Sequence, residues 1–344
     1  MRSARDPWTP LRLVLCFLLL PALVHAAPPE IAWRTHTGDR AEHGAVLLDG
    51  RLYVAGAAKV TDIDPASGII RRFLLPPDPT EITSRPVATA AGIVAGDAAG
   101  RLLLWQEGTP ATVFGALPRS QAVTALQGRG DRLFAGGEDG CVTALGPGAS
   151  RAWSHCTAGV IGDGLAIAGD LVLAGDATGR VSVWSGARGT WRWVYDMDAP
   201  LAGAPVVTGD AVLLVGVDGH LYALDRERGL LRWRVHVGDR VRVAPAMGNG
   251  LVIVVTETRG LVAIDVGTGK VAWRASLPAT PATPAVLGDL VVLGASDNAL
   301  HAFDAASGKS RWRVTVPGAV LAPPLGCDAG ILAVTEDGIV VLMK

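Results

Sequence analysis

The sequence has few aromatic residues, little cysteine and no excess of charge of either sign. Aromatic residues occupy 5% of its 344 positions, and 31 Lys and Arg nearly balance 32 Asp and Glu. The balance excludes a chain that binds nucleic acid through bulk charge and a strongly acidic solvating chain. The hydrophobic content of 49% excludes a disordered chain. A folded protein with no nucleic-acid partner is therefore expected.

Long hydrophobic runs are missing except near the N-terminus. A basic start leads into LRLVLCFLLLPALV, and small residues follow where a signal peptidase cleaves. Since this run is too short for a permanent span, we expect a cleavable signal peptide over 1–26, no transmembrane span and a periplasmic mature chain over 27–344. Lipidation of Cys16 stays open, because Leu15 precedes it where a lipobox needs a small residue.

Glycine and proline are abundant, and tryptophan is periodic. The 43 Gly and 22 Pro favour short elements joined by turns over long helices. Five tryptophans follow one another at intervals of 40, 40, 40 and 39 residues: Trp153, Trp193, Trp233, Trp273 and Trp312. Such a period is the signature of a repeat architecture.

Three of these tryptophans end the same phrase, Ala-x-Asp-x-x-x-Gly-x-x-x-Trp. Its copies are ALDRERGLLRW (223–233), AIDVGTGKVAW (263–273) and AFDAASGKSRW (302–312). Between phrases, apolar runs of four to seven residues are bounded by Gly-Asp, Asn-Gly or Asp-Gly, which is typical of short strands joined by tight hairpins. We interpret the repeated Asp and Gly as turn residues without chemistry.

The count of repeats predicts the architecture. From Trp33 to Trp312 the chain makes seven steps of about 40 residues, and the segment after Trp312 contains three strands without a fourth. The missing strand is found at 31–36. We therefore predict an all-β protein, an eight-bladed β-propeller of four-stranded antiparallel blades, whose ring closes by pairing of the N-terminal strand with the C-terminal three.

The phrase resembles the repeat of the quinoprotein-like propellers, the PQQ-like repeat, with the fullest match over residues 263–273. In that family the Trp docks between blades against the Gly turn of a neighbour. The resemblance thus implies a structural docking role for Trp33, Trp153, Trp193, Trp233, Trp273 and Trp312. Departures exist: Arg72 and Phe73 stand where the first blade should have its Trp, and the second blade (RLLLWQEGTPATVF) has lost most of the phrase.

Two branches of this family imply different functions. The quinoprotein dehydrogenases are much longer and hold a quinone with calcium, commonly under a disulfide of adjacent cysteines, whereas this sequence has no Cys-Cys pair and no Cys-x-x-Cys-His. The branch typified by BamB, in the outer-membrane β-barrel assembly machinery, is short, exported and eight-bladed. That resemblance implies a non-enzymatic scaffold, monomeric within a complex with an envelope protein. Another protein-binding propeller, a quinoprotein-related protein and a structural or sensing module remain alternatives.

No catalytic motif, metal-ligand spacing or phosphate-binding loop occurs, so we expect no catalytic residue, metal or cofactor. Binding is expected where connections from an outer strand to the next inner strand gather at one channel mouth, including 74–85, 195–202 and 236–243. The candidate partner-binding residues in these connections are Asp78, Asp198, Arg240 and Arg242. Arg232 and Arg234 nearby are better explained as a solvated outer strand.

Two cysteines fall in the third blade. If the hairpin of CVTAL and RAWSHC is centred between Pro147 and Ala149, Cys141 and Cys156 face each other. An exported protein experiences oxidising conditions, so we expect a disulfide between them. The alternative is two buried thiols in contact. Cys327 would remain a free thiol.

Overall fold

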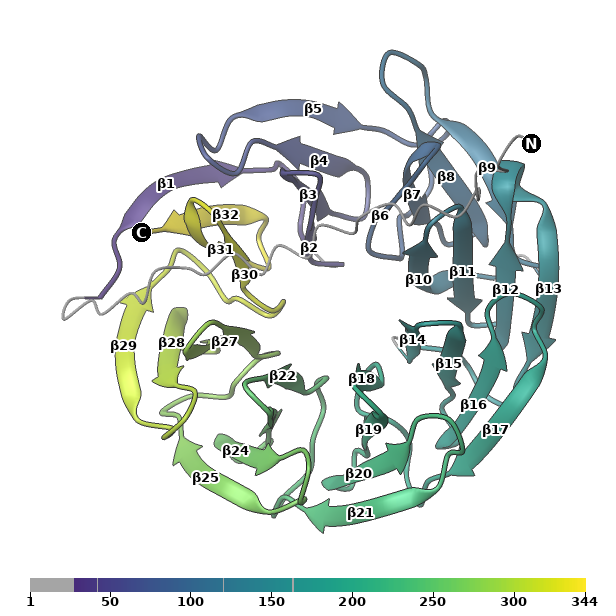
Figure 1. Ribbon diagram of the computed structural model, residues 1–344. Helices are drawn as coiled ribbons and strands as arrows, with labels where there is room; N and C mark the ends of the chain where they lie inside the picture. The colour runs from purple at the N-terminus through teal and green to yellow at the C-terminus, as the bar shows by residue number, and fades with distance from the viewer. Residues whose placement is uncertain (1–27, 42, 120, 163) are drawn as a thin grey trace, which may run out of the picture.

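The computed structural model describes residues 28–41, 43–119, 121–162 and 164–344. Apart from one short 3-10 turn, η1 (Pro147–Ala149), their regular structure consists of strands in eight four-stranded antiparallel sheets. The sheets are arranged as blades in a ring (Figure 1). This confirms the predicted eight-bladed propeller, while the predicted signal peptide and Cys16 lie outside the described residues.

Seven blades each use four consecutive strands, from the channel outward. Blades 1 to 3 contain β2 (Ala45–Leu48), β3 (Arg51–Ala55), β4 (Val60–Ile63), β5 (Ile70–Leu74); β6 (Val87–Thr89), β7 (Gly92–Gly96), β8 (Arg101–Trp105), β9 (Thr112–Ala116); β10 (Val123–Arg129), β11 (Arg132–Gly137), β12 (Cys141–Leu145), β13 (Arg151–Cys156). Blades 4 and 5 contain β14 (Leu165–Ala168), β15 (Leu171–Gly175), β16 (Arg180–Ser185), β17 (Trp191–Asp196); β18 (Val206–Thr208), β19 (Ala211–Val215), β20 (His220–Asp225), β21 (Leu231–His236). Blades 6 and 7 contain β22 (Ala246–Gly248), β23 (Leu251–Val255), β24 (Gly260–Asp265), β25 (Val271–Ser276); β26 (Ala285–Leu287), β27 (Leu290–Ala295), β28 (Ala299–Asp304), β29 (Ser310–Thr315).

Blade 8 joins the two ends of the chain. Its three inner strands are β30 (Leu325–Cys327), β31 (Gly330–Val334) and β32 (Ile339–Met343), and its outer strand is β1 (Ile31–His36). Reciprocal backbone hydrogen bonds between Glu30 and Lys344, at 2.9 and 3.0 Å, extend this ladder to the last residue. The predicted closure is thus confirmed, and β1 covers the edge of β32 at the seam.

The strand directions give the ring two distinct faces. Because each blade has an even number of antiparallel strands, its outermost strand ends on the same face of the ring where its innermost strand begins. Every connection from an outermost strand to the next innermost strand therefore lies on that one face. We call it the connector face; its connections span residues 37–44, 75–86, 117–122, 157–164, 197–205, 237–245, 277–284 and 316–324. The opposite face, the turn face, carries the turns between third and fourth strands, including the repeated Asp and Gly.

The core lies between the blades. The described residues form eight apolar clusters, and each draws its members from two neighbouring blades. In the cluster between blades 4 and 5, Trp193 of β17 is 4% exposed, and its Nε1 donates to the carbonyl of Arg226 at 2.9 Å. Trp153, Trp233 and Trp273 donate equivalent bonds to the next blade.

A glycine makes room for each docked ring. Gly229 has φ +68°, and a Cβ added there would lie 2.6 Å from the Trp193 ring. The same contact recurs in four more places: Trp33 with Gly68, Trp153 with Gly189, Trp233 with Gly269, and Trp273 with Gly308. Trp312 differs, because blade 8 has chain ends where this turn would be; the half-buried ring packs in the cluster of Val341 and Met343.

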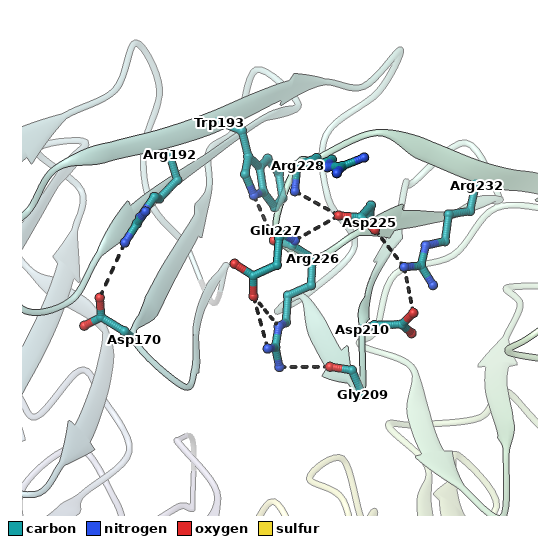
Figure 2. A network of polar contacts seen from close by, with 10 residues as sticks. All are labelled: Asp170, Arg192, Trp193, Gly209, Asp210, Asp225, Arg226, Glu227, Arg228 and Arg232. Atoms are coloured by element: carbon teal, nitrogen blue, oxygen red, sulfur yellow. Dashed lines mark hydrogen bonds and ion pairs between the residues drawn. The ribbon is translucent and has the colours of Figure 1, made fainter.

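The repeated Asp holds the turn that receives the Trp. Figure 2 shows this turn in blade 5, where Asp225 accepts hydrogen bonds from the backbone N–H groups of Glu227 and Arg228. In blade 7, hydrogen bonds from Ser307 and then from Arg311 lower the pKa of Asp304 to about 2. The interpretation of these residues as turn formers is confirmed, since the carboxylate satisfies backbone donors that the turn leaves unpaired.

Candidate functional site: the connector face

A cavity of about 400 Å³ lies at the centre of the connector face. Four of the outer-to-inner connections, which follow β1, β5, β25 and β29, contribute to its wall together with Thr124 of β10. Because Thr124 belongs to blade 3 and Thr283 leads into blade 7, on the other side of the ring, the cavity spans the channel mouth. Its side chains include Arg40, Arg85, Thr283 and Leu321.

Most polar groups in the wall already hold the scaffold together. Thr83 donates through Oγ1 to the carbonyl of Val123 at 2.8 Å, and Ser84 Oγ accepts from the backbone N–H of Gly96 at 2.8 Å. Arg40 forms an ion pair with Glu336. The hydrogen bonds of Thr83 and Ser84 tie the connection after β5 to neighbouring strands, so this part of the wall is pre-organised.

Arg85 and Leu321 offer binding groups at this mouth. Within the described part of the chain, the guanidinium of Arg85 forms no ion pair or hydrogen bond, and its residue is exposed. Leu321 is 53% exposed. A free cation beside an exposed apolar side chain suits recognition of a protein surface, where Arg and apolar contacts recur.

The four predicted partner-binding residues all lie on the connector face, but the structure does not bring them into one cluster. Asp198, Arg240 and Arg242 are on the neighbouring connections after β17 and β21, whereas Asp78 is on the connection after β5. Arg101 donates to both oxygens of Asp78 at 2.8 Å, and this bond lowers the pKa of Asp78.

The other three residues differ in their pairing. Asp198 pairs with Arg234 at 3.0 Å, and Arg242 pairs with Glu257. Arg240 is exposed, and its guanidinium makes no contact of this kind within the described ranges. Since exposed pairs contribute only about 0 to 1 kcal/mol, a partner can exchange them at little cost.

The pair Cys141 and Cys156 lies away from this mouth, in the outer half of blade 3. The two residues are directly opposed on β12 and β13, and their sulfur atoms form a disulfide. Cys327 is a free, half-buried thiol in β30, and burial raises its pKa. The disulfide therefore joins two already paired strands at the end of β13, where the connection to blade 4 begins.

Sequence reasoning missed how blades 1 and 2 compensate for the missing Trp. Arg72 occupies the Trp register position opposite Asp62, which is 0% exposed, and both Arg72 and Arg51 donate to that carboxylate, at 3.2 and 3.1 Å through Nε. From blade 2, Trp105 Nε1 donates to the carbonyl of Leu75 at 2.6 Å. The sequence did contain a signal for this ion pair. In blade 1, Asp62 stands at the Ala position of the repeated phrase, and Arg72 stands at its Trp position.

The fold defines the class of protein: an eight-bladed β-propeller whose outer-to-inner connections surround one channel mouth. A family model described as outer membrane protein assembly factor BamB matches residues 138–284 and 280–343. The chain belongs to this family. Among curated proteins, none matches it in sequence.

Solved structures share the fold across different functions. BamB from Moraxella catarrhalis is 17% identical with a TM-score of 0.75, covering 92% of this chain and 100% of its own. The quinohemoprotein alcohol dehydrogenase from Comamonas testosteroni is 14% identical with a TM-score of 0.76, covering 93% of this chain and 77% of its own. Sqt1 from Saccharomyces cerevisiae is 12% identical with a TM-score of 0.77, covering 91% and 97%. At these identities the likeness concerns the fold alone.

Two kinds of feature are absent from the described residues. They contain no helix that is long and apolar enough to cross a membrane. They also contain no group of three or more His, Cys, Asp or Glu side chains arranged to hold a metal ion.

Proposed function

We propose that this chain is an exported, non-enzymatic scaffold that binds an envelope protein through its connector face, as an assembly factor for outer-membrane β-barrel proteins. The observation that carries the proposal is the match to the BamB family model over more than half of the chain. The predicted signal peptide supports a periplasmic location, with association to the outer membrane through the partner. The chain acts as a monomer within that complex.

The connector face is the proposed binding surface, because a rigid ring holds eight connections around one mouth. Loops held by a rigid scaffold are where binding residues concentrate. On this face Asp198, Arg240 and Arg242 present both signs of charge on adjacent connections, and Arg85 presents a cation in the cavity. Charges at the rim of an interface mainly set the association rate and its salt dependence.

A pull-down from envelope extract tests this proposal. The wild-type chain should capture subunits of the outer-membrane assembly machinery. A variant with Asp78→Arg, Asp198→Arg, Arg240→Glu and Arg242→Glu should capture less, with a loss that grows at low salt. The matched control reverses Arg188 and Arg228, two exposed arginines of the turn face, to Glu.

Two outcomes would count against the proposal. If the wild type captures no assembly subunit, the proposed function is wrong. If the fourfold variant captures as much as the wild type while the turn-face control captures less, the partner binds the opposite face.

The alternative is a quinoprotein-related function, which the shared fold of the Comamonas testosteroni enzyme favours. The cavity does not fit a quinone held by calcium, because Glu336, the only carboxylate among its described lining residues, is paired with Arg40. Calcium takes six to eight oxygen ligands, several of them carboxylates. Adding the quinone, calcium and a primary alcohol as electron donor to the purified chain, and following the reduction of a dye, distinguishes the two functions. Turnover would overturn the scaffold.

A further inference from the structure

The outer strand of each blade is the edge of a sheet, and all but one of these strands carry a charged residue, which disfavours pairing with another chain. Seven of the eight strands carry at least one arginine: β1, β5, β13, β17, β21, β25 and β29. The eighth, β9 of blade 2, reads Thr-Val-Phe-Gly-Ala over Thr112–Ala116 and contains no charged residue. Charged side chains on an edge strand prevent its pairing with another chain. Blade 2 therefore has the one unguarded outer edge among these strands.

The free edge of β9 is open to a further strand. Within the described residues β9 pairs with β8 alone, with Val113 opposite Leu103 and Thr112 opposite Leu104. Its second edge thus presents unpaired backbone N–H and C=O groups. Thr112, Val113 and Ala116 are exposed, with Val113 at 49%.

Blade 2 has also lost the side chain that docks its outer strand. Gly115 stands opposite Leu102 just before the bulge, in the register position that Trp233 holds opposite Ala223. A Cβ on Gly115 would lie 3.2 Å from that of Ala149 in blade 3. The strand therefore lies close to the neighbouring turn without a bulky ring between them.

We propose that the free edge of β9 binds an extended, uncharged polypeptide segment by strand addition, which makes blade 2 five-stranded. Main-chain hydrogen bonds supply the affinity in this mode of binding, and alternate side chains supply the selectivity. Thr112 and Val113 offer β-branched neighbours, which favour β-branched or aromatic residues on the added strand. A charged residue there would lie opposite a side chain with no counter-charge.

A foreign segment fits this edge better than a second copy of the chain. Two copies of a five-residue strand would bury far less than the roughly 1,000 Å² that a stable protein interface needs. An isolated extended segment needs no such area, because it makes its contacts with its backbone. The site lies on the rim of the ring, and its occupation is independent of the connector face.

Fluorescence anisotropy with a labelled peptide tests the proposal. The probe is a capped eight-residue peptide of alternating Thr and Val, flanked by Gly-Ser pairs. The full chain should bind it, and Val113→Lys should weaken binding at least about fivefold, because one cross-strand pair is lost and a charge is placed on the edge. The same peptide methylated on alternate backbone nitrogens should bind more than about tenfold more weakly, because it cannot donate the ladder bonds.

Two controls separate this site from folding and from the connector face. Val271→Lys places the same charge on β25, another outer strand, and should leave peptide binding unchanged. A connector-face variant limited to Asp198→Arg, Arg240→Glu and Arg242→Glu, on the connections after β17 and β21, should also bind the peptide normally. Because Val113 and Val271 are both partly exposed, at 49% and 38%, the two lysine variants should unfold at the wild-type temperature.

Three results would overturn the proposal. They are equal binding by Val113→Lys and the wild type, equal binding of the methylated and unmethylated peptides, and a wild-type dimer that Val113→Lys converts to a monomer in sedimentation. The last result would assign the edge to a second copy of the chain. None of them bears on capture of an envelope partner through the connector face.

Discussion

Replacing Trp193 by alanine should break the contact between blades 4 and 5. The indole is 4% exposed, lies against Gly229 and donates its Nε1 hydrogen to the Arg226 carbonyl. Removing a buried Trp costs about 3 to 5 kcal/mol of unfolding free energy. The turn of blade 5 would also lose the hydrogen bond from the indole to its Arg226 carbonyl. We expect a loss near the upper end of this range, measured by urea unfolding.

Two other tryptophans provide matched controls. Trp312 is half-buried and has no glycine turn opposite it, so Trp312→Ala should cost less, about 2 kcal/mol. Trp191 begins the same strand as Trp193 but is 62% exposed, and Trp191→Ala should change the unfolding free energy by no more than about 0.5 kcal/mol. The expected order is therefore Trp193, then Trp312, then Trp191.

The glycine partner supplies the reciprocal test. Gly229→Ala places a Cβ 2.6 Å from the indole ring at a residue with φ +68°, so it should destabilise the same contact from the other side. In the double variant, alanine at 193 removes the clash. Its loss of unfolding free energy should therefore be smaller than the sum of the losses of the two single variants. Strict additivity, or a loss for Trp193→Ala no larger than that for Trp191→Ala, would refute docking as the source of stability.

Three further predictions concern the seam, the cysteines and acid stability. Deleting residues 28–36 removes β1 and exposes the edge of β32, so the truncated chain should aggregate in light scattering; a monomer of wild-type stability would contradict the closure. Counting thiols in the unfolded, non-reduced mature chain should give one, from Cys327, whereas three would disprove the bridge between Cys141 and Cys156. Because the pKa of Asp304 is lowered to about 2 from 3.8, its contribution to stability is present above pH 3.8 and lost as the pH falls towards 2. Asp304→Asn should remove the fall in stability that protonation of Asp304 causes between pH 3.8 and 2. If the variant and the wild type have the same pH profile of unfolding, Asp304 makes no such contribution.

The fold could be predicted because the residues that recur in each repeat, Trp and Gly, each have one specific structural role. A Trp every 40 residues and a Gly in each turn require one another, as Trp193 and Gly229 show, so the period carries the blade count. The facing of Cys141 and Cys156 followed from strand register, which a short hairpin determines. Local rules of this kind act within one blade or between two neighbours.

The candidate site could be predicted only in part, because it depends on contacts between distant segments. The connections were identified from their place in the repeat, but the cavity wall combines Thr124 of blade 3 with Thr283 before blade 7, from opposite sides of the ring. Arg101 pairing with Asp78 is equally invisible without coordinates. The ion pairs of Asp62 with Arg51 and Arg72 were missed because they replace a hydrophobic contact with an ionic one. In a comparison of repeats, such a replacement looks like the loss of the repeated Trp.

The shared blade at the seam has a consequence for how the chain is made. Among the described strands β1 comes first in the sequence and its partner β32 comes last, so blade 8 cannot assemble until all the strands between them have been synthesised. Contacts between residues so far apart in sequence form slowly. Seven blades can therefore stack as an open arc while β1 remains unpaired, and ring closure becomes the last folding step, at which the protein first gains its full stability.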